Sequence, residues 1–163
     1  MKIAIIGAGY VGLTSAAVFA KIGHKVFITD KDGEKISLIA VGKIPFYEKG
    51  LEELAKKMVL RGMLNAIEST EKAVKDADAI FICVGTPTKK SGEADLSQVF
   101  SAAKEISKYI KNGAVVVNKS TVPVSTAEKV RDLISKNTNA KFYISSCPEF
   151  LREGSALSDT LNP

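Results

Sequence analysis

The chain has 163 residues, of which 45% are hydrophobic and 25% are charged, with 12 glycines and 5 prolines. Length and composition are those of one globular domain with a substantial core, and they exclude a disordered, collagenous or low-complexity chain. The net charge of +5 comes from scattered Lys and Arg residues without interleaved aromatic residues, so we expect no nucleic-acid partner.

Short β-branched runs alternate with amphipathic helical patterns along the whole chain. This alternation is typical of βαβ units and predicts an α/β fold, with a doubly wound, mostly parallel sheet in a single three-layer domain over residues 1–163. The expected strands, in chain order, are Lys2–Ile6, Lys25–Thr29, a weaker Ala66–Glu68, Ala79–Val84, Ala114–Asn118 and Lys141–Ser145.

Helices are expected in the intervals between these strands, with their apolar residues on one face. Asp95 is positioned to cap one helix, with Gln98 reaching back as in a capping box, and Ser125 with Glu128 repeats the pattern. We interpret the apolar stripes of these helices as core and not as binding sites.

A glycine-rich segment, Gly7-Ala8-Gly9-Tyr10-Val11-Gly12, follows the first strand directly and opens a helix. In this context the first glycine permits a tight turn, the second lets the backbone approach a pyrophosphate, and the third lets helix and strand pack closely. Asp30 ends the second strand, eighteen residues after Gly12, where a carboxylate accepts hydrogen bonds from an adenosine ribose and repels a 2′-phosphate. The pattern predicts a Rossmann-like site for NAD rather than NADP, a preference that Lys31 and Lys35 weaken.

Hydroxyl and carboxyl side chains follow three later strands. Ligands of doubly wound sheets bind beyond the carboxyl ends of the strands, so we expect these groups to converge on one rim. Taken singly, each of these hydroxyl or carboxyl residues could equally well belong to a local turn or to the solvated start of a helix, without binding a ligand. The segments are Gly85-Thr86-Pro87, Lys119-Ser120-Thr121-Val122-Pro123 and Ser146-Cys147-Pro148-Glu149-Phe150-Leu151-Arg152-Glu153.

Several site types are excluded by the residues present. No apolar run reaches the ~18 residues of a bilayer span, and the apolar start ends in glycines and not in a secretion cleavage site. Cys83 and Cys147 form no CxxC pair or His/Cys cluster, which argues against a disulfide framework and a metal site. The single histidine, His24, lies at the opposite sheet edge, so no Ser-His-Asp triad is available. We expect a cytoplasmic protein without a membrane partner.

Six motifs occur in one order along the chain, and together they resemble the UDP-glucose/GDP-mannose dehydrogenase family, most closely its UDP-glucose 6-dehydrogenase branch. The resemblance covers the whole chain. Phe150 followed by Leu-Arg-Glu argues against the N-acetylmannosamine branch, which usually has Arg at the position of Phe150. The motifs are Gly7 to Leu13, Phe46-Tyr47-Glu48 with Gly50-Leu51, Val84 to Pro87, Ala94-Asp95-Leu96, Lys119 to Pro123, and Pro148 to Gly154.

The resemblance implies an oxidoreductase of nucleotide-sugar metabolism and polysaccharide biosynthesis. Such enzymes oxidise the C6 alcohol of UDP-glucose or a related UDP-sugar to a carboxylate in two hydride transfers, with two NAD and no metal. Glu149, helped by Thr121, would activate the water that hydrolyses a covalent thioester, and Glu153 would lie near the nicotinamide. The implied catalytic residues are thus Thr121, Glu149 and Glu153. The implied cofactor-binding residues are Gly7, Gly9, Tyr10, Val11, Gly12, Asp30, Lys35, Gly85, Thr86, Pro87, Ser120, Thr121 and Glu153, and the substrate-binding residues are Phe150, Leu151 and Arg152.

The chain also departs from the family pattern. Family members are more than twice as long, and their nucleophilic cysteine, an assisting lysine and asparagine and most of the uridine pocket lie in a central helix and a C-terminal UDP-binding domain. We therefore expect residues 1–163 to be inactive alone, and the full-length family to form homodimers. Smaller departures are Lys49 where the family often has Pro, Ser125 where it usually has Gly, and Cys147 where Asn or Ser is common.

Three alternatives stay open. An N-acetylmannosamine-type UDP-sugar dehydrogenase differs mainly in the last motif. A β-hydroxyacid dehydrogenase shares the opening glycine pattern and a hydroxyl after a late strand, but it lacks Pro-Glu-Phe-Leu-Arg-Glu. A non-catalytic module that senses NAD would need the glycine turn and Asp30, and it would make no use of Thr121 and Glu149.

Overall fold

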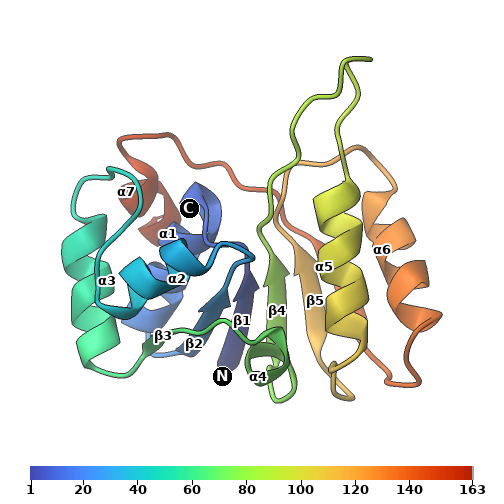
Figure 1. The fold of residues 1–163 in the computed structure, drawn as a ribbon, viewed down its shortest axis with the longest axis horizontal. Helices are drawn as coiled ribbons and strands as arrows, with labels where there is room; N and C mark the ends of the chain where they lie inside the picture. Colours follow the sequence, from blue (N-terminus) through green and yellow to red (C-terminus); the bar gives the residue numbers. More distant parts are fainter. Residues whose placement is uncertain (163) are drawn as a thin grey trace.

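Six strands form one sheet in which every neighbouring pair runs parallel (Figure 1). The computed structural model describes residues 1–162. The strand order, β3-β2-β1-β4-β5-β6, reverses direction at β1, which confirms the doubly wound sheet expected from the sequence. The strands are β1 (Lys2–Ile6), β2 (Lys25–Thr29), β3 (Leu64–Ala66), β4 (Ala79–Ile82), β5 (Val115–Asn118) and β6 (Tyr143–Ser146).

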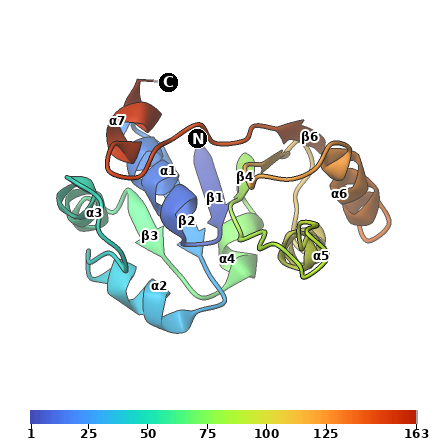
Figure 2. The same ribbon diagram turned by 90° about the horizontal axis from the view of Figure 1, so that it is seen from above.

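Helices lie on both sides of the sheet, which gives the three layers seen in Figure 2. Side chains of β1 alternate between two cores, because successive residues of a strand point to opposite faces. Ile3 and Ile5 pack with α1, α2 and α3, whereas Ala4 and Ile6 pack with α4, α5 and α6. The helices are α1 (Tyr10–Lys21), α2 (Gly33–Ala40), α3 (Leu51–Leu60), α4 (Thr70–Val74), α5 (Ser97–Ser107), α6 (Thr126–Ser135) and α7 (Ala156–Leu161).

The predicted strand positions are correct, with shifts of one or two residues at some ends. The weak strand expected at Ala66–Glu68 begins earlier, because Leu64 is the buried residue that lies beside Val26 in the register. The fourth strand ends at Ile82 and not at Val84. The carbonyl of Ile82 accepts hydrogen bonds from the amides of Lys119 and Ser120, at 2.9 and 3.1 Å. These are the last such bonds of the strand, and the residues after Ile82 turn toward the rim.

Both predicted capping boxes are wrong in detail. The carboxylate of Asp95 accepts from the amide of Ser97 at 2.9 Å, but the cap position of α5 is Leu96, and the amide of Asp95 donates to the carbonyl of Pro87 and not to Gln98. Ser125 does occupy the cap position of α6, yet its side chain makes no capping hydrogen bond. Its backbone is left-handed, with φ of 66°, and this conformation turns the chain sharply into the helix.

The last part of the chain returns across the rim of the sheet. After β6 it passes over the carboxyl ends of the strands and ends in α7, which packs against α1 (Figures 1 and 2). Two segments far apart in the sequence, the glycine turn and residues 147–155, are therefore brought to the same edge. Among residues 1–162, no helix has both the length and the apolar character that crossing a membrane requires.

Candidate functional site

The glycine turn between β1 and α1 is held by close backbone contacts that exclude larger side chains. Gly7 has φ of 107°, its amide donates to the carbonyl of Thr29 at 2.8 Å, and a Cβ on it would lie 2.5 Å from the carbonyl oxygen of Cys83. A Cβ on Gly12 would lie 1.9 Å from the carbonyl oxygen of Gly7. The first and third glycines therefore serve the tight turn and the helix contact that the motif predicts.

The amino terminus of α1 is open to an anionic ligand. No side chain caps it at Gly9, and its first turn contains no acidic residue, so the first amides of the helix and its positive dipole end stay available. A Cβ on Gly9 would meet no atom within 4 Å, in contrast to Gly7 and Gly12. The second glycine thus borders open space, as expected of a position that a pyrophosphate approaches closely.

Asp30 lies beside this turn at the end of β2. One of its carboxylate oxygens accepts from the amide of Ala8 at 2.6 Å, and the other accepts from the amide of Asp32 at 3.0 Å. Each carboxylate oxygen carries a further lone pair for a ligand hydroxyl. Lys35 lies in the first turn of α2, where Asp32 caps the helix and pairs with the ammonium group of Lys35 at 3.8 Å.

A groove of about 790 Å³ extends from the glycine turn along the edge of the sheet to α5. This volume is within the range typical of small-molecule sites. Five of the cofactor residues implied by the sequence line it: Gly7, Gly9, Asp30, Lys35 and Gly85. The polar wall opposite the turn was not anticipated, since its residues look like ordinary surface in the sequence. They are Ser97, Gln98, Ser101 and Glu105 of α5, Glu68 of the β3–α4 connection, and Thr70, the first residue of α4.

The hydroxyls and the carboxylate that follow β4, β5 and β6 form one hydrogen-bonded chain. The hydroxyl of Thr86 donates to the carbonyl of Thr121 at 2.9 Å, and the hydroxyl of Thr121 donates to the Oε1 of Glu149 at 2.9 Å. The expected convergence on one rim is therefore present. The Oε2 of Glu149 is shielded from solvent without a hydrogen-bond partner among the described residues, which leaves this oxygen with unused accepting capacity.

Ser120 is buried beneath the hydrogen bonds that join Thr86, Thr121 and Glu149. Its hydroxyl donates to the carbonyl of Val84 at 2.7 Å, and so joins the ends of β4 and β5 below the rim. The side chain thus fixes the spacing of the loops that carry Thr86 and Thr121.

The segment after Glu149 lies over the rim, with the side chains of Phe150, Arg152 and Glu153 exposed and that of Leu151 partly buried. Phe150 is 89% exposed, and Glu153 is also exposed. Arg152 is held in place by Asp159 of α7: its Nε and Nη2 donate to the two carboxylate oxygens at 3.1 and 2.9 Å. The hydrogen bonds from this guanidinium hold the pKa of Asp159 well below its usual range.

A second polar cluster joins this segment to the glycine turn. The hydroxyl of Tyr10, the first residue of α1, donates to the Oε2 of Glu48, and the amide of Gly154 donates to the same oxygen at 2.8 Å. Glu48 is only 3% exposed. The hydrogen bond from Tyr10 lowers the pKa of Glu48, against the opposing effect of burial.

The two cysteines differ in environment. Cys83 lies under the glycine turn, where burial raises the pKa of its thiol to about 12. Cys147 is exposed on the rim segment. His24 precedes β2, at the amino-terminal edge of the sheet, as the sequence indicated.

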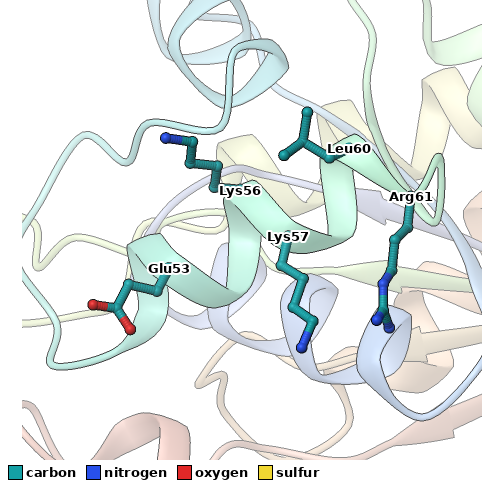
Figure 3. A pocket seen from close by; sticks show the side chains of 5 residues that line it. All are labelled: Glu53, Lys56, Lys57, Leu60 and Arg61. Carbon is teal, nitrogen blue, oxygen red and sulfur yellow. The ribbon is translucent and has the colours of Figure 1, made fainter.

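A shallow hollow of about 430 Å³ lies along α3, away from all the residues implied by the sequence. Figure 3 shows its charged side chains extending from a single helix, without a converging set of polar groups. Its lining residues are Glu53, Lys56, Lys57, Leu60 and Arg61.

Comparisons with known proteins show the family to which the chain belongs. A sequence profile described as the UDP-glucose/GDP-mannose dehydrogenase family, NAD binding domain, matches residues 1–163. A UDP-glucose 6-dehydrogenase of Bacillus subtilis is 48% identical over 163 residues, which cover 99% of this chain and 35% of that enzyme. The structure of a UDP-glucose dehydrogenase from the hyperthermophilic archaeon Pyrobaculum islandicum matches with a TM-score of 0.95 and 40% identity, over 99% of this chain and 38% of that one.

A GDP-mannose dehydrogenase from Pseudomonas aeruginosa, solved as a ternary complex, matches with a TM-score of 0.93 and 40% identity, over 98% of this chain and 38% of that one. The chain thus spans little more than a third of the length of these relatives. The family profile, the sequence relatives and the solved structures all match over nearly the whole chain. The chain belongs to the UDP-glucose/GDP-mannose dehydrogenase family, and residues 1–163 are its NAD-binding domain.

Proposed function

We propose that these residues form the NAD-binding half of an enzyme that oxidises the C6 alcohol of UDP-glucose to the carboxylate of UDP-glucuronate, using two NAD. The observation that carries the proposal is the shared sheet edge: the open end of α1, Asp30 and the Thr86–Thr121–Glu149 chain border one surface. Relatives that are named as UDP-glucose 6-dehydrogenases support the choice of substrate.

The residues present fit a dinucleotide. The amides of Tyr10 and Val11 at the start of α1 would bind the pyrophosphate, and Asp30 with Lys35 would bind the adenosine ribose. The groove reaches Gly85, and the surface beyond it, at Thr86 and Pro87, would accommodate the nicotinamide half. NAD supplies the hydride acceptor when it is bound, and the chain supplies its orientation and the groups around it.

Glu149 and Thr121 are proposed to act on water in the hydrolytic step. The Oε1 of Glu149 is oriented by the hydroxyl of Thr121, and its Oε2 is sheltered and free to accept a hydrogen bond from a water molecule. A carboxylate held in this way would orient a water and take a proton from it. Glu153 would lie beside the nicotinamide end.

The exposed segment of Phe150, Leu151 and Arg152 is proposed to contact the sugar diphosphate. Asp159 fixes the orientation of the Arg152 guanidinium and offsets its charge, so Arg152 would bind the diphosphate as an ordered hydrogen-bond donor that needs little reordering. The family match favours a nucleotide sugar over the short hydroxyacids of the alternative enzyme class.

The cofactor part is tested by titrating the 163-residue chain with NAD and NADP in a calorimeter. We expect binding of NAD, with NADP at least about ten-fold weaker because of the charge of Asp30. The same chain with NAD and UDP-glucose should produce no NADH. Absence of heat with NAD contradicts the assignment of the site, and steady NADH production contradicts the expected inactivity of residues 1–163 alone.

The catalytic part is tested in a chimera that joins residues 1–163 to the remaining two thirds of the Bacillus subtilis enzyme. We expect the chimera to oxidise UDP-glucose, and Glu149→Gln to lose the release of UDP-glucuronate while single-turnover NADH formation persists. A module that only senses NAD would tolerate Glu149→Gln together with Thr121→Val. Wild-type steady-state turnover in that double variant would therefore contradict the catalytic roles.

A further inference from the structure

The Phe46-Tyr47-Glu48 motif plays no part in the proposed chemistry, yet the structure places it against both halves of the site. It lies in the connection between α2 and α3. The ring of Phe46 packs on the ring of Tyr10, with centroids 5.0 Å apart and an interplanar angle of 39°. Tyr47 is 85% exposed, whereas Glu48 is buried. The outer two residues of the motif therefore enclose the side chain of Tyr10.

Neutral groups donate to one oxygen of the Glu48 carboxylate, its Oε2, whereas its Oε1 is buried without a hydrogen-bond partner among residues 1–162. Within residues 1–162 no ion pair includes this carboxylate. Its Oε2 accepts from the hydroxyl of Tyr10 and from the amide of Gly154. The same amide lies 3.1 Å from the hydroxyl oxygen of Tyr10, to which it also donates. A buried carboxylate is unfavourable unless such bonds compensate for its lost hydration, and hydrogen bonds to a charged acceptor are about twice as strong as neutral ones. The three groups are therefore expected to stay together.

These contacts join two functional segments that are 144 residues apart in sequence. Tyr10 begins the helix whose amides face the proposed pyrophosphate position. Gly154 directly follows Glu153, and it turns the chain into α7 with φ of 86°. A displacement of Gly154 would move Glu153 directly, and it would release one end of the short segment whose other end is Glu149.

We propose that Glu48 is a positioning residue, which ties the segment of residues 149–154 to the start of α1 and so couples its placement to the turn that binds NAD. The inference rests on the proposed function, since the segment carries the proposed catalytic carboxylates. Coupling between two sites is reciprocal, so NAD at the turn should also order the segment. Glutamine at position 48 keeps the shape of the side chain but removes the charge that holds both donors.

The test is hydrogen–deuterium exchange of the 163-residue chain, followed by mass spectrometry, with and without saturating NAD. In the wild-type chain, NAD should slow exchange in peptides covering residues 149–161. In Glu48→Gln we expect exchange there to be about ten-fold faster without NAD, and the protection by NAD to be lost while NAD still binds. Glu53→Gln, an exposed change of the same kind on α3, is the matched control and should behave as wild type.

A purely local packing role would speed exchange by the same factor with and without NAD, and that result would overturn the coupling. If Glu48→Gln destabilises the whole domain, Tyr10→Phe decides, because it keeps the carboxylate and its bond to Gly154 while removing the link to α1. This variant should lose the protection by NAD in residues 149–161 alone, and full protection would overturn the proposal. If the wild-type chain binds no NAD, the proposed function fails, whereas the NAD-free exchange rates still show whether Glu48 holds the segment.

Discussion

Alanine at the second and third glycines of the turn should separate stability from cofactor binding. At Gly12 the added Cβ would lie 1.9 Å from the backbone oxygen of Gly7, where ordinary contact begins near 3.4 Å. The start of α1 would have to move by about 1.5 Å, and with it the fully buried Leu13. At Gly9 the Cβ meets no protein atom within 4 Å, and φ of −78° suits alanine.

The size of the effect at Gly12 follows from two opposing contributions. Overpacking against a backbone atom lowers the free energy of unfolding by about 3 kcal/mol, at the upper end for cores. Alanine in place of glycine within a helix raises the free energy of unfolding by about 1 kcal/mol. The net loss of about 2 kcal/mol corresponds to a melting temperature roughly 4–8 °C lower for a domain of this size. Gly9→Ala loses only a good cap residue, which costs less than about 1 kcal/mol.

Differential scanning calorimetry and NAD titration of both variants check the reasoning. Gly12→Ala should melt at a lower temperature, whereas Gly9→Ala should melt within about 3 °C of wild type yet bind NAD at least about ten-fold more weakly, because its methyl group occupies the approach of the pyrophosphate. A wild-type melting temperature for Gly12→Ala would refute the packing argument. Undiminished NAD affinity in Gly9→Ala would refute the assignment of the open face.

Three further predictions concern single side chains. Asp30→Asn should narrow the difference in affinity between NAD and NADP, as measured by calorimetry; an unchanged ratio would contradict the role of the charge. A thiol reagent at pH 7.5 should label Cys147 in the folded chain and Cys83 only after unfolding, because burial raises the pKa of Cys83 to about 12; equal labelling rates by mass spectrometry would contradict this. Ser125→Gly should raise the melting temperature by roughly 2–4 °C, since glycine relieves about 1 kcal/mol of left-handed strain, and a lower value would contradict the strain.

Part of the candidate site could be predicted because it depends on residues that are neighbours in the sequence. The order of strands and helices follows from hydrophobic periodicity, and the glycine turn needs only the six residues from Gly7 to Gly12 between a strand and a helix. Asp30 was predicted to bind the ribose because it is an acidic residue at the end of the second strand, eighteen residues after Gly12. The family departure at Ser125 also has a local meaning, because the structure places this residue in the left-handed region that glycine tolerates best.

Other features depend on contacts that no local pattern encodes. Most of the polar wall of the groove comes from α5, whose polar residues look like ordinary solvated surface in the sequence. Glu48 looks like a loop glutamate, although it is the most buried carboxylate of the described chain. Its burial results from the return of residues 147–161 across the rim, a path set by the packing of α7 on α1.

The sequence by itself determined the class of fold, the glycine turn and the presence of the acidic residue Asp30 beside that turn, because each depends on neighbouring residues and on the regular geometry of βαβ units. Only the tertiary structure decided that Thr86, Thr121 and Glu149 form one hydrogen-bonded chain, and that Tyr10 and Gly154 share the carboxylate of Glu48. Hydrogen bonds between groups brought together by long-range packing depend on distances that are set only when the whole sheet and its covering helices have assembled.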